Sequence, residues 1–192
     1  SIGERGGLVT DLSTNAGINI LTISATAGNQ SYNGEIRDGP SMRIGIVKSN
    51  ANFQLLGGTN SDYSGGTLIG GGALRAIIGE GISARGLILI TNAVFETWVN
   101  ITNQIGMGEG QIQILGGVSG FSAVGTNIVV AAGGTSTTLV WGTPTFNPSQ
   151  LVLNDSSATS LLTFSNGLNL NSAGRIITVN ANTAVVAGAI IN

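Results

Sequence analysis

The chain has 192 residues, of which 31 are glycine, 42% are hydrophobic and only 8% are charged, with a formal net charge of −2. A chain of this length can form one domain with a continuous core. The negative net charge excludes a basic nucleic-acid footprint, and no apolar stretch approaches the roughly 18 residues of a membrane helix. We therefore expect neither a nucleic-acid partner nor insertion into a membrane.

Cysteine and histidine are both absent from the sequence. Without cysteine there are no disulfides, no thiolate chemistry and no cysteine-based metal site. Without histidine the chain lacks the commonest general base and the commonest metal ligand. These absences predict a protein that is not an enzyme and that has no metal or other cofactor.

The first part of the chain, residues 1–67, contains four candidate strands at 7–10, 18–23, 44–47 and 53–56. Segment 18–23 (INILTI) alternates apolar and polar residues, as a half-buried strand does. Residues 15–21 (NAGINIL) match 50–56 (NANFQLL), and Tyr32-Asn33-Gly34 matches Tyr63-Ser64-Gly65. A repeat of roughly 30 residues is typical of stacked structural units.

The middle of the chain continues in the same way after a glycine corner at 70–72. Residues 73–78 could also form a short helix, but glycines at 72, 79 and 81 disfavour one. The strands that we expect here are 73–78, 87–90, 111–115, 127–130 and 138–141.

The last part, residues 149–190, repeats short β-rich runs that end at Asn, Ser, Asp or Gly, residues that mark turns. The strands that we expect here are 151–153, 161–164, 168–170, 176–179 and 185–186. Many short strands at near-regular spacing predict an all-β parallel β-helix, or β-solenoid, in which glycine forms the corners. We expect one unit over 1–192 with nine or ten rungs of about 20 residues and a length of about 45 Å.

Three segments resemble autotransporter-associated β-strand repeats, also called passenger-associated transport repeats. Segment 60–76 (NSDYSGGTLIGGGALRA) is similar to the N-T-Y-(S/T)-G-G-T signature, and 119–142 and 149–190 resemble the later part of the long repeat form. The resemblance implies a right-handed β-helix at the bacterial cell surface or in the extracellular space. The leading hypothesis is therefore a structural unit of an extracellular filament or giant adhesin, without catalysis.

The two ends of the chain show no evident cap, so we expect a solenoid that is uncapped at both ends. After Gly34-Glu35-Ile36, Gly45 follows Ile36 by nine positions, and Gly7 would follow Ile190 equally if another copy began after Asn192. This match predicts one period of a longer array, in which identical units stack head to tail, covalently or not. The predicted junction residues are Val185, Val186, Gly188, Ile190 and Ile191 on one side and Ile2, Gly7, Leu8 and Val9 on the other.

The alternative is a carbohydrate-binding or carbohydrate-cleaving β-helix. Arg37, Asp38, Arg43 and Lys48 could form a cleaving cluster, but such sites need several converging carboxylates, and the acids here are scattered. Replacing Asp38 and Arg43 with alanine should therefore leave the function intact. Tyr32, Tyr63, Trp98 and Trp141 could stack on surface glycans, although core positions are favoured for them.

Three further motifs have simpler explanations than a binding site. Residues 106–110 (GMGEG) superficially resemble a phosphate-binding loop, but no strand and helix frame them, so a β-arc corner is favoured. A flat ice- or crystal-binding face would need rows of Thr-X-Thr that the sequence does not sustain. Asn154, Asn166, Asn169, Asn171 and Asn180 are expected at inward or corner positions, stacked in ladders.

Overall fold

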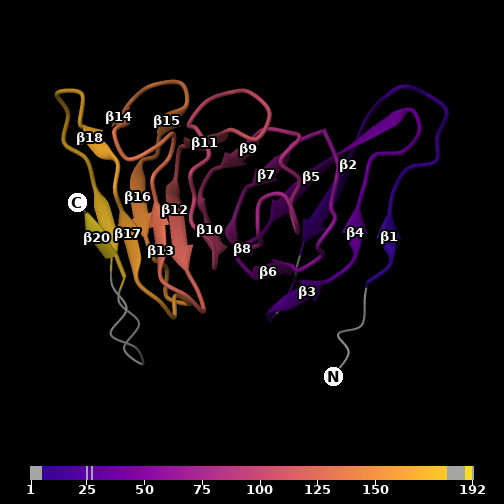
Figure 1. Cartoon of the computed structure of the whole chain (residues 1–192), viewed down its shortest axis with the longest axis horizontal. Coiled ribbons are helices and arrows are strands. Elements are labelled where there is room, and N and C mark those ends of the chain that lie inside the picture. The colour runs from indigo at the N-terminus through magenta and orange to yellow at the C-terminus, as the bar shows by residue number, and fades with distance from the viewer. Residues whose placement is uncertain (1–5, 25, 27, 181–188, 192) are drawn as a thin grey trace.

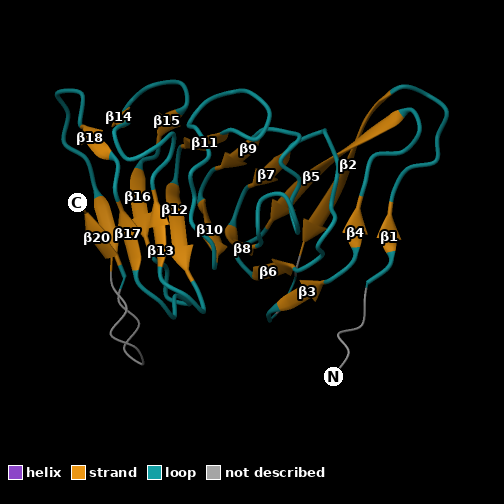
Figure 2. Cartoon of the chain, in the orientation of Figure 1, coloured by secondary structure: helices purple, strands orange, loops and turns teal. Residues whose placement is uncertain are grey.

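The computed structural model describes residues 6–24, 26, 28–180 and 189–191. In these residues the chain forms twenty strands and no helix, and every strand pairs in parallel with its neighbours. The fold is a β-solenoid of about seven turns, with β1 near one end and β20 at the other (Figures 1 and 2). The predicted all-β parallel solenoid is confirmed.

The larger sheet contains seven strands, one from each turn. From the N-terminal end its strands are β3 (Gln30–Tyr32), β6 (Phe53–Leu56), β8 (Gly72–Arg75), β10 (Ala93–Thr97), β12 (Val118–Ala123), β16 (Gln150–Leu153) and β19 (Ile177–Val179).

The second sheet contains six strands and ends one turn earlier. Its strands are β2 (Gly17–Ser24), β5 (Met42–Ser49), β7 (Thr67–Ile69), β9 (Ile88–Ile90), β11 (Ile112–Leu115) and β15 (Phe146–Asn147).

The remaining strands make smaller parallel sheets. The pair β1 (Leu8–Val9) and β4 (Glu35–Ile36) forms one, and single bridges join Arg37 to Asp62 and Ile101 to Val130. The others are a three-stranded sheet of β13 (Ile128–Val130), β17 (Leu162–Phe164) and β20 (Ala189–Ile191), and a two-stranded sheet of β14 (Thr138–Val140) and β18 (Gly167–Asn169).

The corner between the six- and seven-stranded sheets uses left-handed backbone in successive turns. The φ angles there are 70° at Asn50, 59° at Gly72, 50° at Asn92 and 59° at Gly116. Asparagine and glycine tolerate this conformation better than other residues do, so they recur where each turn bends from one sheet to the next.

Inward-facing side chains stack in rows along the solenoid axis. In the six-stranded sheet, register pairing aligns Ile23, Lys48, Ile69, Ile90 and Ile114. In the seven-stranded sheet, Phe95 pairs with Phe121, and both side chains are buried. Stacking of like side chains in successive turns builds one continuous apolar core.

The expected number and size of the rungs are wrong. One turn takes 20 residues between Phe53 and Ala73 and 34 between Ile128 and Leu162, because the later turns add β14 and β18. About seven turns at the usual strand spacing make a solenoid about 30 Å long instead of the expected 45 Å.

The internal repeat is not a structural repeat. Residues 15–21 belong mainly to β2 of the six-stranded sheet, whereas 50–56 lead into β6 of the seven-stranded sheet. The partner of β2 is β5, with Ile18 opposite Arg43. The similarity reflects two strands with the same alternation and not two equivalent positions in successive turns.

Candidate functional site

Strand β2 forms the N-terminal edge of the six-stranded sheet. It has eight residues, GINILTIS, without a charge or a proline, and only β5 lies beside it in the described part of the chain. The side chains of Ile18 and Ile20 are 47% and 56% exposed. Nearby in the first turn, Leu8 and Leu12 are 58% and 78% exposed. Four large apolar side chains of the first turn are therefore solvent-exposed in the described structure.

The register identifies which main-chain groups of β2 point away from the sheet. On β5, the main-chain groups of Ile44 and Ile46 bond toward the β7 side, to Gly65 N and Gly66 O. The intervening residue, Gly45, must therefore bond to β2, at the neighbours of its register partner Ile20. By the same alternation, the N–H and C=O groups of Ile18, Ile20, Thr22 and Ser24 point to the open edge.

The opposite end of the same sheet is closed by the chain itself. On β15, Thr145 O and Asn147 O accept hydrogen bonds from the β11 side, so the main-chain groups of Phe146 point outward. Gly142 N donates to Phe146 O at 2.9 Å, and Phe146 N donates to Thr143 O at 3.3 Å. The last strand of the six-stranded sheet therefore presents no free hydrogen-bonding groups at Phe146.

The structure describes some of the residues of the predicted head-to-tail junction within the single chain. Ile190 and Ile191 lie in β20, whose backbone pairs with β17, and Leu8 and Val9 lie in β1, which pairs with β4. Gly7 lies just before β1 and is exposed. The other predicted junction residues, Ile2, Val185, Val186 and Gly188, lie outside the described residues.

The nine-residue spacing that matched Gly7 with Gly45, on which that junction was based, does not correspond to equivalent positions in the structure. Leu8 lies opposite Glu35, so Gly7 corresponds to Gly34 and not to Gly45 of β5. The junction itself stays a prediction without this support.

The proposed cleaving cluster of Arg37, Asp38, Arg43 and Lys48 does not converge. Arg37 forms an ion pair with Glu35 at 2.9 Å. Asp38 lies before β5, whereas Lys48 lies near the end of that strand and points into the core. Arg43 is exposed on the outer face between them. These side chains have separate structural environments.

Asp38 fastens two successive turns together. Its carboxylate accepts hydrogen bonds from Ile44 N at 2.7 Å, Ser64 N at 3.1 Å and Ser64 Oγ at 2.6 Å. Partial burial acts to raise the pKa of Asp38, but the hydrogen bonds from Ser64 and Ile44 and the charge of Arg85 outweigh it and lower the pKa. Removal of Asp38 should therefore weaken the contact between these two turns, and the expectation that its removal leaves the function intact stays a prediction.

Lys48 is a buried cation in the core. Its side chain is fully buried, and Nζ donates to the carbonyl oxygens of Asn50 at 2.7 Å, Asn52 at 2.5 Å and Gly71 at 2.5 Å. An ammonium has three donors, so these three carbonyls satisfy all of them. Burial lowers the pKa of Lys48. The residue ties the corner of one turn to the corner of the next.

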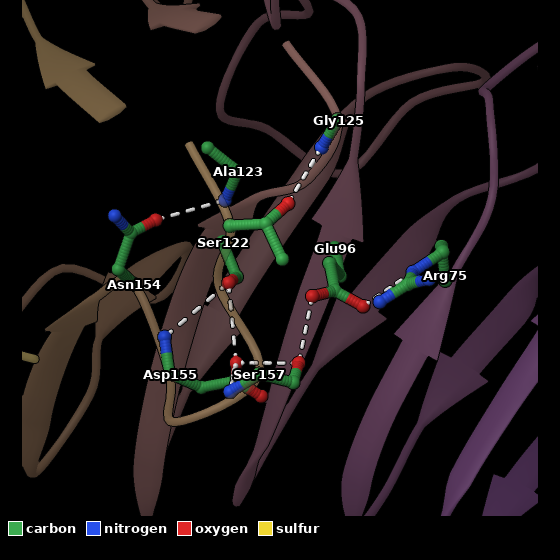
Figure 3. Close-up of polar contacts among 9 residues, drawn as sticks. Arg75, Glu96, Ser122, Ala123, Gly125, Asn154, Asp155 and Ser157 are labelled. Carbon is green, nitrogen blue, oxygen red and sulfur yellow. Dashed lines mark hydrogen bonds and ion pairs between the residues drawn. The ribbon is translucent and has the colours of Figure 1, made fainter. Parts of the chain in front are cut away.

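A polar network lies across β8, β10 and β12 of the seven-stranded sheet (Figure 3). Glu96 on β10 is fully buried, and its Oε2 lies 2.6 Å from Arg75 Nε on β8. Ser157 Oγ lies within hydrogen-bonding distance of both Glu96 Oε1, at 2.7 Å, and Asp155 Oδ1, at 2.8 Å. Ser122 Oγ on β12 donates to Asp155 Oδ1 at 3.2 Å. Both oxygens of Glu96 are engaged, so this buried carboxylate serves structure.

The loop 154–161, which we call the clamp loop, supplies Asp155 and Ser157 to this network. Ala123 N donates to Asn154 Oδ1 and Gly125 N donates to Thr159 Oγ1, both at 2.8 Å (Figure 3). The clamp loop therefore bonds to β12 and its following corner, one turn earlier, and through Ser157 to β10, two turns earlier.

Two of the five predicted corner asparagines are buried. Asn166 Oδ1 accepts from Ala132 N at 2.7 Å, and its Nδ2 donates to the carbonyls of Ala132, Gly134 and Thr137. Asn154 is fully buried, and Asn180 Nδ2 donates to its carbonyl from the next turn at 2.9 Å. Asn169 and Asn171 are exposed, so the predicted ladder is limited to the step from Asn154 to Asn180.

The aromatic side chains are mainly structural. Trp141 and Tyr63 are fully buried, as favoured from sequence, with Trp141 Nε1 donating to Pro148 O at 2.8 Å. Trp98 and Tyr32 are half-buried. The 106–110 segment leads directly into β11, which agrees with a turn and not with a phosphate-binding loop.

Sequence reasoning missed the roles of Lys48, Glu96 and Ser157. A charge within the apolar run AVFETW is the only local signal for Glu96, and nothing local identifies Ser157 as its partner. In the described residues, no group of three or more acidic, histidine or cysteine side chains is placed to hold a metal ion, and no helix could cross a membrane.

No protein-family model, curated protein or solved structure matches this chain. The resemblance to autotransporter-associated repeats therefore stays a hypothesis that rests on the sequence motifs.

Proposed function

We propose that this chain is a structural unit of an extracellular bacterial filament or large surface adhesin, whose solenoid units associate through their ends. The observation that carries the proposal is the open edge of β2. Exposed edge strands are usually protected by charges, proline, bulges or short length, and β2 has eight residues with no charge and no proline. A long apolar edge of this kind is suited to pairing with another strand.

The proposal includes a right-handed coil, because parallel crossover connections are almost always right-handed. It also includes ends without caps. Leu8 and Leu12 in the first turn and Val179 in the last strand of the seven-stranded sheet support this, since all three are substantially exposed. The absence of cysteine is compatible with a secreted chain. We propose no catalytic role.

The test compares the association of the wild-type chain with that of an edge variant. Wild-type protein should form concentration-dependent assemblies in sedimentation velocity. Ile20→Lys adds a charge to the open edge and should abolish assembly. Val140→Lys, at a side chain that is 36% exposed on the short strand β14, is the matched control and should assemble normally. A wild-type chain that stays monomeric at all concentrations would refute the proposal.

A cleft supports a second candidate function, the binding of neutral glycans. Its volume is about 330 Å³, and its walls carry the side chains of Gln104, Thr138, Thr145 and Val140. Hydroxyl and amide groups without a charged side chain suit a neutral sugar, and this volume is at the small end of ligand sites. Saturation-transfer NMR with maltotriose, cellotriose and N-acetylchitotriose would test this, with loss of signal expected in Gln104→Ala.

A further inference from the structure

We propose that β2 pairs antiparallel with β2 of a second copy, so that two solenoids join head to head about a two-fold axis. This inference rests on the proposed function, because it concerns how the ends associate. It differs from the head-to-tail arrangement expected from sequence. The partner surface is the same eight-residue edge, Gly17–Ser24, on both chains.

Among the described residues, the far end of the solenoid offers β2 no equivalent edge. The outward groups of Phe146 on β15 are already bonded to Gly142 and Thr143 of the same chain. The other strands that end sheets there, β18, β19 and β20, have three residues each. Figure 1 shows β18 and β20 at the end of the solenoid farthest from β1. A head-to-tail contact would therefore leave most of the eight-residue edge unpaired.

The edge is complementary to itself. In an antiparallel pair, residues whose main-chain groups point at each other exchange two hydrogen bonds. On β2 these are Ile18, Ile20, Thr22 and Ser24. With Leu21 on the two-fold axis, Ile18 lies opposite Ser24 and Ile20 lies opposite Thr22, which gives about eight intermolecular hydrogen bonds. No like charges face each other, because the strand carries none.

The alternative register places Ile20 on the axis and is poorer. It pairs Ile18 with Thr22 and leaves Ser24 outside the ladder, which gives about six hydrogen bonds. The Leu21-centred register also joins the two six-stranded sheets into one continuous sheet. It thereby satisfies the open edge of both copies at once, as a closed isologous contact does.

Cysteine cross-linking tests this arrangement without competing thiols, because the chain contains no cysteine. In the proposed register Leu21 faces Leu21 of the second copy in a non-hydrogen-bonded pair, with a Cα separation of about 4.5 Å. This separation lies within disulfide range. Leu21→Cys should therefore give a covalent dimer in high yield on mild oxidation. Met107→Cys, at an exposed loop position far along the chain, is the control and should not cross-link.

A second measurement avoids any change to the partly buried Leu21. An equimolar mixture of Ile20→Cys and Thr22→Cys should give mixed dimers in preference to dimers of either variant alone. If the wild-type chain assembles but none of these variants cross-links, the head-to-head inference is wrong and the proposed function stands. A monomeric wild-type chain refutes both.

Discussion

Ser157 and Glu96 are separated by 61 residues, yet Ser157 Oγ donates a hydrogen bond to Glu96 Oε1 at 2.7 Å. The contact joins the clamp loop to a strand two turns earlier in the seven-stranded sheet. A buried carboxylate needs each of its donors, because a lost hydrogen bond to a charged group is not replaced by water.

Ser157→Ala should therefore lower the free energy of unfolding by about 2 kcal/mol. The neighbouring Ser156→Ala is the matched control, because Ser156 is exposed, and it should change stability by less than about 0.5 kcal/mol. Urea unfolding of the three proteins measures the difference. Equal stabilities for the two variants would contradict a stabilising role for the hydrogen bond between the clamp loop and Glu96.

Lys48→Met should destabilise the chain by about 3 kcal/mol, because it leaves the carbonyls of Asn50, Asn52 and Gly71 without their donor. Ile46→Met changes the same face of β5 without removing a polar group, and should cost less than about 1.5 kcal/mol. Chemical denaturation of both variants measures the two losses of stability, and their difference separates the loss of hydrogen bonds from the cost of repacking. A stabilised Lys48→Met protein would show that burial of the ammonium outweighs its three bonds.

Tyr63 should make stability fall at alkaline pH. Burial raises the pKa of Tyr63 from its usual 10.0 to about 12. Between pH 10 and 12 the unfolded tyrosine loses its proton while the folded one keeps it, so stability falls by about 1.4 kcal/mol per pH unit. Tyr63→Phe removes this contribution. The free energies of unfolding of the wild type and of Tyr63→Phe, measured from pH 9 to 11.5, should therefore converge as the pH rises. Parallel pH profiles would contradict the raised pKa of Tyr63.

Thr97→Val should stabilise the chain by about 1 kcal/mol. Thr97 is fully buried, and in the described structure its Oγ1 is the buried side-chain atom that has no hydrogen-bond partner. Thr67→Val is the opposite case, since the buried Thr67 Oγ1 lies 2.7 Å from the hydroxyl of Tyr63, and it should be destabilising. Thermal unfolding of both variants gives the sign of each effect.

Asp38→Asn should lower the free energy of unfolding at neutral pH and should lower it much less in acid. The folded pKa of Asp38 is lowered, so its stabilising contribution is complete above its usual value of 3.8 and is lost as the pH falls through the folded pKa. The stability difference between wild type and variant should shrink below about pH 4. A difference that is constant from pH 7 to 2 would contradict the role of the carboxylate.

The sequence predicts strands well where alternation or β-branched residues are dense. The expected strand 53–56 coincides with β6, and 18–23 lies within β2. Strand β12 was missed because VSGFSA is rich in small residues, which pack tightly here, with Gly120 against the backbone of Val152. Local composition does not reveal such close packing between turns.

Pairing between turns was much harder to predict. Turn length varies, so a fixed period of about 20 or 30 residues cannot identify which strands are neighbours. The contact of Ser157 with Glu96 spans two turns and depends on the path of the clamp loop. The closure of β15 by Gly142 and Thr143 likewise depends on a turn that has no distinctive sequence motif.

Lys48 has a consequence for how the chain finds its correct winding. Its row otherwise consists of Ile23, Ile69, Ile90, Ile114 and Phe146. The four isoleucines are nearly interchangeable, so turns stacked in the wrong order would have similar apolar contacts. In the native winding, the corners of two successive turns present the three carbonyls that accept hydrogen bonds from the lysine. A mis-stacked coil that separated Lys48 from these carbonyls would bury an unsatisfied ammonium among apolar side chains, at a cost of several kcal/mol. Lys48 therefore stabilises the native order of the turns relative to arrangements in which its turn is stacked elsewhere along the solenoid.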